Sequence, residues 1–280
     1  QTKHLECNSY PYQSIDSGLF YKKVNKKLKE NKNISFYKHI KDIKINNAFI
    51  FNSIPSLKTD NDNLWQHFYG IEIETNDNFF DDNIFNLMDF NCEQRGCVHF
   101  FYTLPFEKKR ALVETTWLSK INDDSIKDYD NQIRDYIKNQ LNIKKYKINY
   151  KEEGAIPLFY SSNIREKNKI NIGTAGCMTR LSTGYTFLNI QEHSKYIREN
   201  IENISSAQIF KIAKKYQFLD KIFLRVLEKH PEKMPNIFFK MFNTSSNTVI
   251  KFLSNKSNVF DDLSIIARMP KWIFMKSIFK

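Results

Sequence analysis

The residue whose type and setting could most directly do chemistry is a glutamate within an apolar stretch. Glu114 lies in the segment RALVETTWLS, where its neighbours are mostly apolar or aromatic. Full burial in such surroundings raises the pKa of a carboxyl group by as much as about 3–5 units, so that the group stays protonated at neutral pH and acts as an acid. The pattern alone favours the other interpretation, an outward-facing strand glutamate in water.

A second candidate is a loop of small residues that follows a predicted strand. The loop contains Gly173, Thr174, Ala175 and Gly176, and it is closed by a segment with Thr183 and Gly184. Small residues allow backbone N–H groups to approach a ligand, and a helix that begins there favours an anionic group. A tight strand-to-helix turn explains the same spacing, and on the spacing alone it is the more frequent case.

Acids and aromatic residues are dense around these two segments. Glu152 and Glu153 precede a Gly and a Pro, which together indicate a fixed bend. Aromatic faces line pockets for long apolar ligands and stabilise cations by about 0.5–2 kcal/mol per favourable contact. An ordinary core uses the same residue types. The aromatic residues concerned are Phe100, Phe101, Tyr102, Phe106, Trp117, Tyr185 and Phe187.

Short strands and several helices must position these side chains. Alternating and β-branched segments between residues 65 and 116 predict an antiparallel sheet with one packed face. ISFY and IKINNAFIF are also predicted to be strands. The spacing of apolar residues predicts helices in SIDSGLFYKKVNKKLKEN, in NDDSIKDYDNQIRDYIKNQL, from the small-residue loop to about residue 201, and from residue 205 to 280.

The composition restricts the classes of function. The 280 residues carry 43 Lys+Arg against 31 Asp+Glu, a formal net charge of +12, which suits nucleic acid or an anionic membrane surface. No helix-turn-helix, RRM or zinc-finger pattern is present, so we expect no nucleic-acid partner. The four cysteines contain no CxxC pair, so we expect no metal site and free thiols in a reducing cytoplasm. No apolar run approaches about 20 residues, so we expect no transmembrane segment.

Taken in order, the chemical segments resemble the flavin-dependent lycopene cyclase family. The resemblance runs in register from about residue 14 to the C-terminus, through QHFYGIEIET, MDF with FFYTLPF, RALVETTWLS, EEGAIPL and IGTAGCMTRLSTGYTF. It implies the cyclisation of the ψ-end groups of lycopene to β-rings. This isomerisation is redox-neutral but depends on reduced FAD, with NAD(P)H as the electron source.

The resemblance also implies an α/β fold, or α+β as truncated. This is a Rossmann-like FAD/NAD(P)-binding flavoprotein fold with an antiparallel-sheet substrate domain and C-terminal helices. Residues 1–60 are then the remaining part of the FAD-binding domain and residues 61–160 the substrate domain with one helix. Residues 161–202 return to the FAD-binding domain, and residues 203–280 form a C-terminal helical region.

Site residues follow from the same resemblance. Glu114 is implied to be the acid/base residue. The residues implied to lie by the flavin are Gly173, Thr174, Ala175, Gly176, Thr183 and Gly184. Those expected to line the substrate pocket are Asp89, Phe101, Tyr102, Trp117, Glu153, Tyr185 and Phe187. The sequence leaves open whether Glu114 or the flavin delivers the proton.

The sequence departs from the family pattern in several places. It lacks the GxGxxG turn that holds the FAD pyrophosphate. Cys177, Leu181 and Ile54 stand where a glycine, a proline and an arginine are expected. We therefore expect an N-terminally truncated cyclase that binds FAD below full affinity.

The C-terminal segment bears on where such an enzyme works. RMPKWIFMKSIFK mixes aromatic residues, Met and Lys, a combination typical of a segment at a membrane surface, and packing on the domain explains it equally well. Because lycopene is insoluble in water, we expect a cytoplasmic enzyme that is peripherally associated with a membrane. Two other functions fit the sequence: a flavin-dependent reductase or hydroxylase acting on prenyl chains, and a remnant that binds membrane or carotenoid without turnover.

Overall fold

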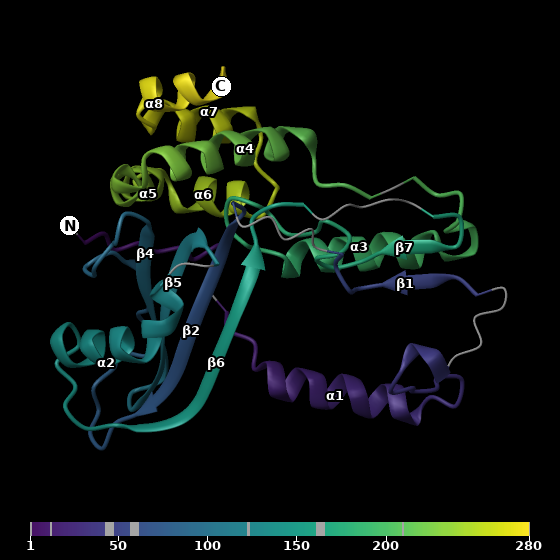
Figure 1. The fold of residues 1–280 in the computed structure, drawn as a ribbon, viewed down its shortest axis with the longest axis horizontal. Helices are drawn as coiled ribbons and strands as arrows, with labels where there is room; N and C mark the ends of the chain where they lie inside the picture. The colour runs from purple at the N-terminus through teal and green to yellow at the C-terminus, as the bar shows by residue number, and fades with distance from the viewer. Residues whose placement is uncertain are drawn as a thin grey trace.

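A five-stranded antiparallel sheet occupies one side of the molecule (Figure 1). The computed structural model describes residues 2–11, 13–42, 48–56, 62–121, 124–160, 166–208 and 210–279. The strand order is β3-β4-β5-β2-β6. The strands are β2 (Leu64–Glu74), β3 (Asn86–Asp89), β4 (Val98–Glu107), β5 (Arg110–Lys120) and β6 (Lys147–Pro157). Every neighbouring pair is antiparallel, which confirms the predicted sheet.

One face of this sheet is covered by helix α2 (Tyr129–Asn139). Its buried Ile133 and Ile137 pack in one apolar cluster with Val113 of β5 and Phe101 of β4. This confirms the predicted helix from Tyr129 onward. The residues just before it, Asp124–Asp128, form a 3-10 helix instead. The possible helix start at residue 123 lies outside the described residues.

Five C-terminal helices cover one end of the other face. They are α4 (Lys214–Lys229), α5 (Met234–Phe242), α6 (Ser246–Leu253), α7 (Val259–Arg268) and α8 (Lys271–Ile278). Val226 and Ile237 from these helices share a buried cluster with Val98, Phe100 and Leu118 of the sheet. Full burial of one such side chain contributes roughly 1.5–3 kcal/mol. Figure 1 shows these helices stacked beyond the ends of β2, β4 and β5, with α7 and α8 outermost.

A smaller parallel pair lies beside the main sheet. It consists of β1 (Ile50–Asn52) and β7 (Lys169–Asn171), and helix α3 (Phe187–Glu199) follows the loop after β7. Helix α1 (Ser17–Glu30) lies apart from both sheets in Figure 1 and buries none of its residues. Asp16 caps its start, because Asp16 Oδ1 accepts a hydrogen bond from Leu19 N over 2.8 Å. Short 3-10 helices cover Ile40–Asp42, Ile201–Asn203 and Pro231–Lys233.

Some predicted elements differ from the structure. ISFY forms no strand, because Phe36 and Tyr37 are exposed and no neighbouring strand pairs with them. Of IKINNAFIF, only Ile50–Asn52 forms a strand, and residues 43–47 lie outside the described part. Helix α4 begins at Lys214, later than the predicted start at residue 205. The mixed α/β class is confirmed, and within the described ranges no helix is both long and apolar enough to cross a bilayer.

Candidate active site

Glu114 lies in the middle of β5, the central strand of the five. The segment RALVETTWLSK favours a strand because it is rich in β-branched and aromatic residues. Its side chains alternate between the two faces of the sheet. Val113 belongs to the apolar cluster under α2, so Glu114 points to the opposite face. This is the face whose far end, at Leu118, is covered by the C-terminal helices.

Three side chains on this face, those of Tyr102, Glu114 and Glu152, lie in one row across the sheet. Glu114 is paired with Tyr102 on β4 and with Gly70 on β2, and Gly70 is paired with Glu152 on β6. Directly paired residues point to the same face of a sheet. Gly70 places no side chain between the two acids. The row therefore holds an aromatic hydroxyl, a carboxyl group, a glycine over which Leu112 Cδ1 of β5 and the Glu152 side chain lie, and a second carboxyl group.

The surroundings of Glu114 adjust its acidity. The pKa of Glu114 is raised to about 7: burial raises it most, a hydrogen bond from Thr116 lowers it, and the negative charge of Glu152 raises it. Thr116 Oγ1 donates this bond to Glu114 Oε1 over 2.8 Å. Burial also raises the pKa of Glu152 above its ordinary value. A large fraction of Glu114 is thus protonated near neutral pH, which is the condition that a general acid requires.

Of the two acids before the predicted bend, the structure places the first on this face. Glu153 pairs with Tyr69, so it points to the α2 face of the sheet, and it is exposed. Glu152 is the acid on the same face as Glu114. The prediction of a pocket residue at 153 is therefore off by one position. Strand alternation counted from Gly154, which lies against Phe68 of the neighbouring strand, is the signal that separates the two.

Three predicted pocket residues lie on the α2 face, away from Glu114. They are Asp89, Phe101 and Trp117. Tyr136 of α2 donates a hydrogen bond of 2.7 Å from its hydroxyl to Asp89 Oδ2, and its ring stacks on Phe101 at 3.9 Å between centroids. Trp117 is fully buried and donates a 3.0 Å hydrogen bond to Gln132. The predicted pocket set is thus divided between the two faces, because successive residues of one strand, such as Phe101 and Tyr102, point to opposite faces.

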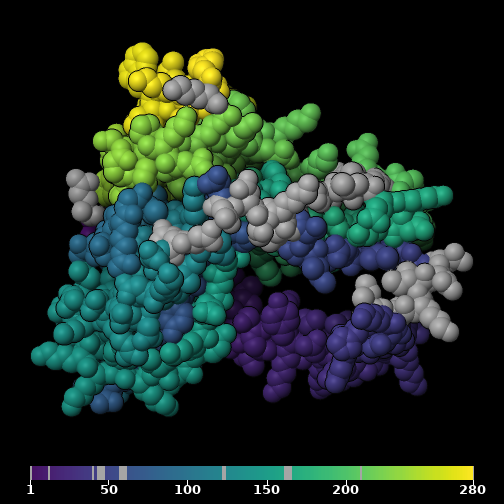
Figure 2. All heavy atoms as spheres, in the orientation of Figure 1, coloured from purple at the N-terminus to yellow at the C-terminus, as the bar shows by residue number. Residues whose placement is uncertain are grey.

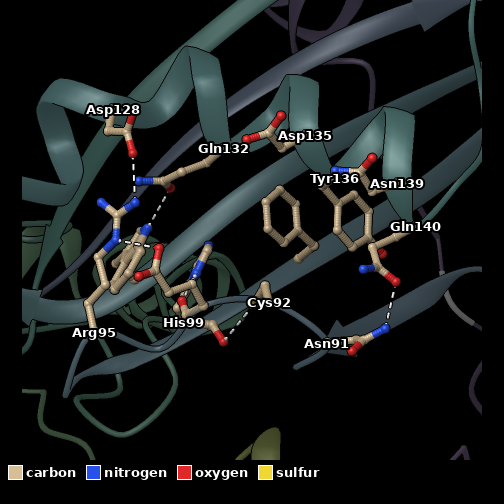
Figure 3. Close-up of a pocket in the computed structure, with 13 residues that line it drawn as sticks. Asn91, Cys92, Arg95, His99, Asp128, Gln132, Asp135, Tyr136, Asn139 and Gln140 are labelled. Carbon is tan, nitrogen blue, oxygen red and sulfur yellow. Dashed lines mark hydrogen bonds and ion pairs between the residues drawn. The ribbon is translucent and has the colours of Figure 1, made fainter.

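A small pocket of about 160 Å³ opens on this α2 side (Figure 3). Phe101 and Trp117 belong to its lining, together with His99. His99 is buried and stacks on Trp117 with 3.9 Å between ring centroids. Burial lowers the pKa of His99 to about 4, so its ring is neutral, with Nδ1 donating to the Glu93 carbonyl over 2.7 Å. The other ring nitrogen lies 2.7 Å from Thr115 Oγ1, the residue next to Glu114.

Buried polar side chains on the α2 face of the sheet hold the central strand in place. Thr115 and Trp117 flank the Thr116 position and are both held by partners on the α2 side. His67 of β2 contacts Ser119 at 2.8 Å and also bonds to the Tyr129 hydroxyl. Satisfied networks of this kind fix strands rigidly. The sequence interpretation did not single out these histidines, and a buried histidine on an alternating strand gives no distinct signal.

The small-residue loop after β7 forms a tight turn. Gly176 lies against its own strand, since an added Cβ would lie 2.6 Å from Asn171 O. Gly173 has a positive φ of 58° and open space around it, because the nearest atom to an added Cβ is Ile190 Cδ1 at 4.0 Å. Cys177 has φ of 60°, a conformation that glycine adopts without cost, at the position where the family pattern has a glycine.

The closing segment of this loop contacts the Glu114 face. Gly184 has φ of 70°, and an added Cβ would lie 2.4 Å from Gln66 Oε1 and 3.6 Å from Ile156 Cδ1. Gln66 pairs with Leu118, on the same face as Glu114 and about 13 Å along β5 at 3.4 Å per residue. The predicted flavin loop and Glu114 are thus brought to one side of the sheet. Tyr185 and Phe187, beside this contact, are both exposed.

A buried ion pair anchors the loop to the C-terminal helices. Arg180 Nε donates to both carboxylate oxygens of Asp220 on α4, at 2.8 and 2.9 Å, and both side chains are at most 1% exposed. Ser182 donates a 2.7 Å hydrogen bond to the same carboxylate. The Arg180 guanidinium also stacks on the rings of Tyr216 and Phe252. This linkage fixes the loop relative to the helices that cover the sheet.

Comparison with known proteins shows what the chain is similar to. No curated protein matches the chain. Among solved structures it is similar to a geranylgeranyl bacteriochlorophyll reductase-like protein from Thermoplasma acidophilum, with 18% identity, a TM-score of 0.45 and coverage of 79% of this chain and 56% of that one. It is also similar to a flavoprotein/dehydrogenase from Cytophaga hutchinsonii, with 10% identity, a TM-score of 0.41 and coverage of 77% and 55%. The chain spans just over half the length of these structures.

A family model gives the broadest match. The model described as lycopene cyclase protein covers residues 3–278, which include both carboxyl groups of the Glu114 row, the small-residue loop and the C-terminal helices. The chain therefore belongs to the lycopene cyclase family.

Proposed function

We propose that the protein cyclises the ψ-end groups of lycopene to β-rings, an isomerisation in the intramolecular lyase class. The observation that carries this proposal is the Glu114 carboxyl group, held on the central strand with its pKa raised to about 7 by burial. Because the chain covers about half the length of the solved structures it matches, the activity is proposed for the protein that contains it.

The chemistry of the reaction explains why such a carboxyl group is needed. A terminal alkene is a poor base, so it is protonated only by an acid in a site that excludes water. The O–H bond of protonated Glu114 breaks, and the π electrons of the alkene form a new C–H bond. The resulting tertiary carbocation is attacked by an internal double bond, which closes a six-membered ring. Loss of a ring proton then restores a double bond, so that no electrons are gained or lost.

The row around Glu114 offers support for the positive charge of this intermediate. Tyr102 is directly opposite Glu114 on the neighbouring strand. The face of an aromatic ring stabilises a cation by about 0.5–2 kcal/mol. After the proton transfer, the Glu114 carboxylate is itself negatively charged beside the cation. Both groups lower the energy of the charged state without forming a covalent bond.

The family implies a flavin, and the loop after β7 fits one side of such a group. Gly173 and Thr174 would contact it, because the space over Gly173 is open and the Thr174 side chain is half-buried. Ala175 and Gly176 instead close the turn and are buried. FAD, when bound in its reduced form with NAD(P)H as the electron source, would supply an electron-rich surface that stabilises positive charge. The backbone N–H groups of Thr183 and Gly184 donate to the Arg180 carbonyl within the loop, and Gly184 lies against Gln66 of the sheet face.

A membrane surface is the proposed source of the lycopene. Helix α7 turns Asp262 inward, where its carboxylate lies 2.8 Å from Lys215 Nζ, and turns Phe260, 82% exposed, outward. On α8, Trp272 is 75% exposed and Lys271 is also exposed. Aromatic residues beside lysines suit the interface of an anionic membrane. Figure 2 shows the C-terminal helices, in yellow, at one end of the molecule.

Expression in lycopene-accumulating bacteria tests the proposed reaction. The complete reading frame that contains this chain is expressed, and the pigments are separated by chromatography. We expect lycopene to be converted to products with β-rings and an unchanged number of hydrogen atoms. A product with added hydrogen or oxygen would contradict the proposal and would indicate a prenyl-chain reductase or hydroxylase instead.

A further inference from the structure

The cyclisation needs two proton transfers at different carbon atoms, and the sheet presents two carboxyl groups. One transfer adds a proton to the terminal alkene, and the other removes a proton from the closed ring. A single carboxyl group would have to reach both carbon atoms. With two carboxyl groups, one can protonate the alkene and the other can remove the ring proton. Paired carboxyl groups with separate acid and base roles solve the same problem in glycoside hydrolysis.

Gly70 makes the arrangement of the two carboxyl groups possible. An added Cβ at Gly70 would lie 3.1 Å from Leu112 Cδ1 of β5, 3.2 Å from Glu152 Cγ and 3.3 Å from Glu152 Oε1. The Glu152 carboxyl group thus extends over Gly70, in the direction of β5 and Glu114. Since Gly70 is the direct partner of Glu114, the Glu152 carboxyl group lies about one strand spacing, roughly 4.8 Å, from the Glu114 strand. No side chain of β2 separates the two groups in this row.

The remaining titratable groups on this face are already engaged or are not acids at neutral pH. Glu72 of β2 lies one step further along the face, where Arg110 is 3.6 Å from its carboxylate. Tyr102 of β4 flanks Glu114 on the other side and carries a phenol. Glu152 of β6 is the acid whose charge acts on Glu114. It is half-buried, so it combines access with partial protection from water.

From this geometry we propose that Glu152 is the base of the reaction, a role that rests on the cyclisation proposed above. After Glu114 has given its proton to the alkene and the ring has closed, a ring C–H bond breaks. Its electrons form the ring double bond, and the proton goes to a carboxylate oxygen of Glu152. The two carboxyl groups then hold one proton between them, as at the start, but the proton is on Glu152 instead of Glu114. Transfer of this proton from Glu152 to Glu114 resets the site without any oxidant or reductant.

Variants at three positions test the role of Glu152. Glu152→Gln removes the base, and we expect β-ring output in lycopene-accumulating bacteria to fall at least tenfold. Glu152→Asp retains a carboxylate on a shorter side chain, and we expect partial recovery. Glu153→Gln, on the other face, is the matched control and should equal the wild type. Gly70→Ala, with both acids intact, should also lower output because its methyl group displaces the Glu152 side chain.

A titration of Glu114 separates failure of this role from failure of the reaction. Carboxyl-labelled glutamate followed by carbon NMR reports the pKa of Glu114 in the wild type and in Glu152→Gln. We expect the pKa to fall in the variant, because the facing negative charge is gone. Wild-type β-ring output in Glu152→Gln, or an unchanged Glu114 titration, would overturn the proposed role. If the wild type closes no rings, the proposed reaction and the role of Glu152 as its base are both overturned. A fall of the Glu114 pKa in Glu152→Gln would then still show that the two carboxyl groups are coupled.

Discussion

Thr116 and Glu114 share a hydrogen bond on the central strand, from Thr116 Oγ1 to Glu114 Oε1 over 2.8 Å. The two residues are two positions apart, so both point to the same face of the sheet. The bond favours the ionised carboxylate and lowers the pKa of Glu114, while burial acts in the opposite direction and is the larger effect. The pKa of Glu114 is thus set by two opposing effects, burial and the hydrogen bond from the Thr116 hydroxyl group.

Removing this hydroxyl group should make Glu114 a weaker acid. In Thr116→Val we expect the pKa of Glu114 to rise above its wild-type value of about 7. Because the reaction needs the protonated form, the rate of cyclisation falls as the pH rises through this pKa, and in the variant the fall should begin at higher pH. The measurement is the pH dependence of cyclisation. Thr116→Ser keeps the hydroxyl group and should retain the wild-type profile, and a fall at lower pH in Thr116→Val would contradict the assignment.

The raised pKa of Glu114 also predicts how stability depends on pH. The folded-state pKa of about 7 lies above the ordinary value of 4.5, so the folded protein binds the proton more tightly than the unfolded chain. The resulting stability is fully present below about pH 4.5 and is lost as the pH rises through 7. Glu114→Gln removes this loss. The free energy of unfolding of the variant minus that of wild type should therefore be larger at pH 9 than at pH 4.5 by on the order of 3 kcal/mol.

Urea unfolding at the two pH values measures this difference. The free energy of unfolding of wild type and Glu114→Gln is compared at pH 4.5 and at pH 9. Glu107→Gln, an exposed acid at the end of β4, is the control and should show no such pH-dependent gain. Equal differences at the two pH values would show that Glu114 titrates as it would in water.

The Arg180–Asp220 pair should be essential for docking of the loop. Asp220→Asn leaves a buried guanidinium without its charged partner, which costs about 3–5 kcal/mol in comparable cases. Thermal unfolding should show a large loss of stability. Asp124→Asn removes a pair with Lys127 that is almost fully exposed, and it should leave stability nearly unchanged. A similar small effect of both changes would mean that the buried pair does not hold the loop.

The outer face of α7 and α8 should carry membrane binding. A double variant, Phe260→Ser with Trp272→Ser, removes the two most exposed aromatic side chains of these helices. Binding to vesicles that contain anionic phospholipid, measured by sedimentation, should weaken at least tenfold. Phe36→Ser removes another exposed aromatic side chain, outside these helices, and is the control. Equal vesicle binding by all three proteins would contradict a membrane contact at α7 and α8.

The strand pattern predicted much of the fold because it is local. The alternation in QHFYGIEIET and RALVETTWLS specifies two strands, and both form as expected. The start of α1 was predictable from Asp16, whose side chain caps the helix. ISFY has the same residue types but forms no strand, since strand formation also needs a partner that the local sequence does not reveal.

The site was predicted less completely, because it depends on register between distant strands. The position of Glu114 on one face follows from its own strand, but its relation to Glu152 passes through Gly70 and two ladders of hydrogen bonds. A shift of one residue in β6 would put Glu153 in place of Glu152. For the same reason the predicted pocket residues Asp89, Phe101 and Trp117 could not be separated from those on the face of Glu114, although they lie on the α2 face.

Replacement of the single acid on the central strand tests the proposed mechanism most directly. Glu114→Gln preserves the size and hydrogen-bonding shape of the side chain but cannot give up a proton. In lycopene-accumulating bacteria that express the complete reading frame, β-ring output should fall by about 10²–10⁴-fold relative to wild type, with lycopene retained and the protein still folded. Glu107→Gln should leave output unchanged. Wild-type amounts of cyclised product from Glu114→Gln would contradict the mechanism.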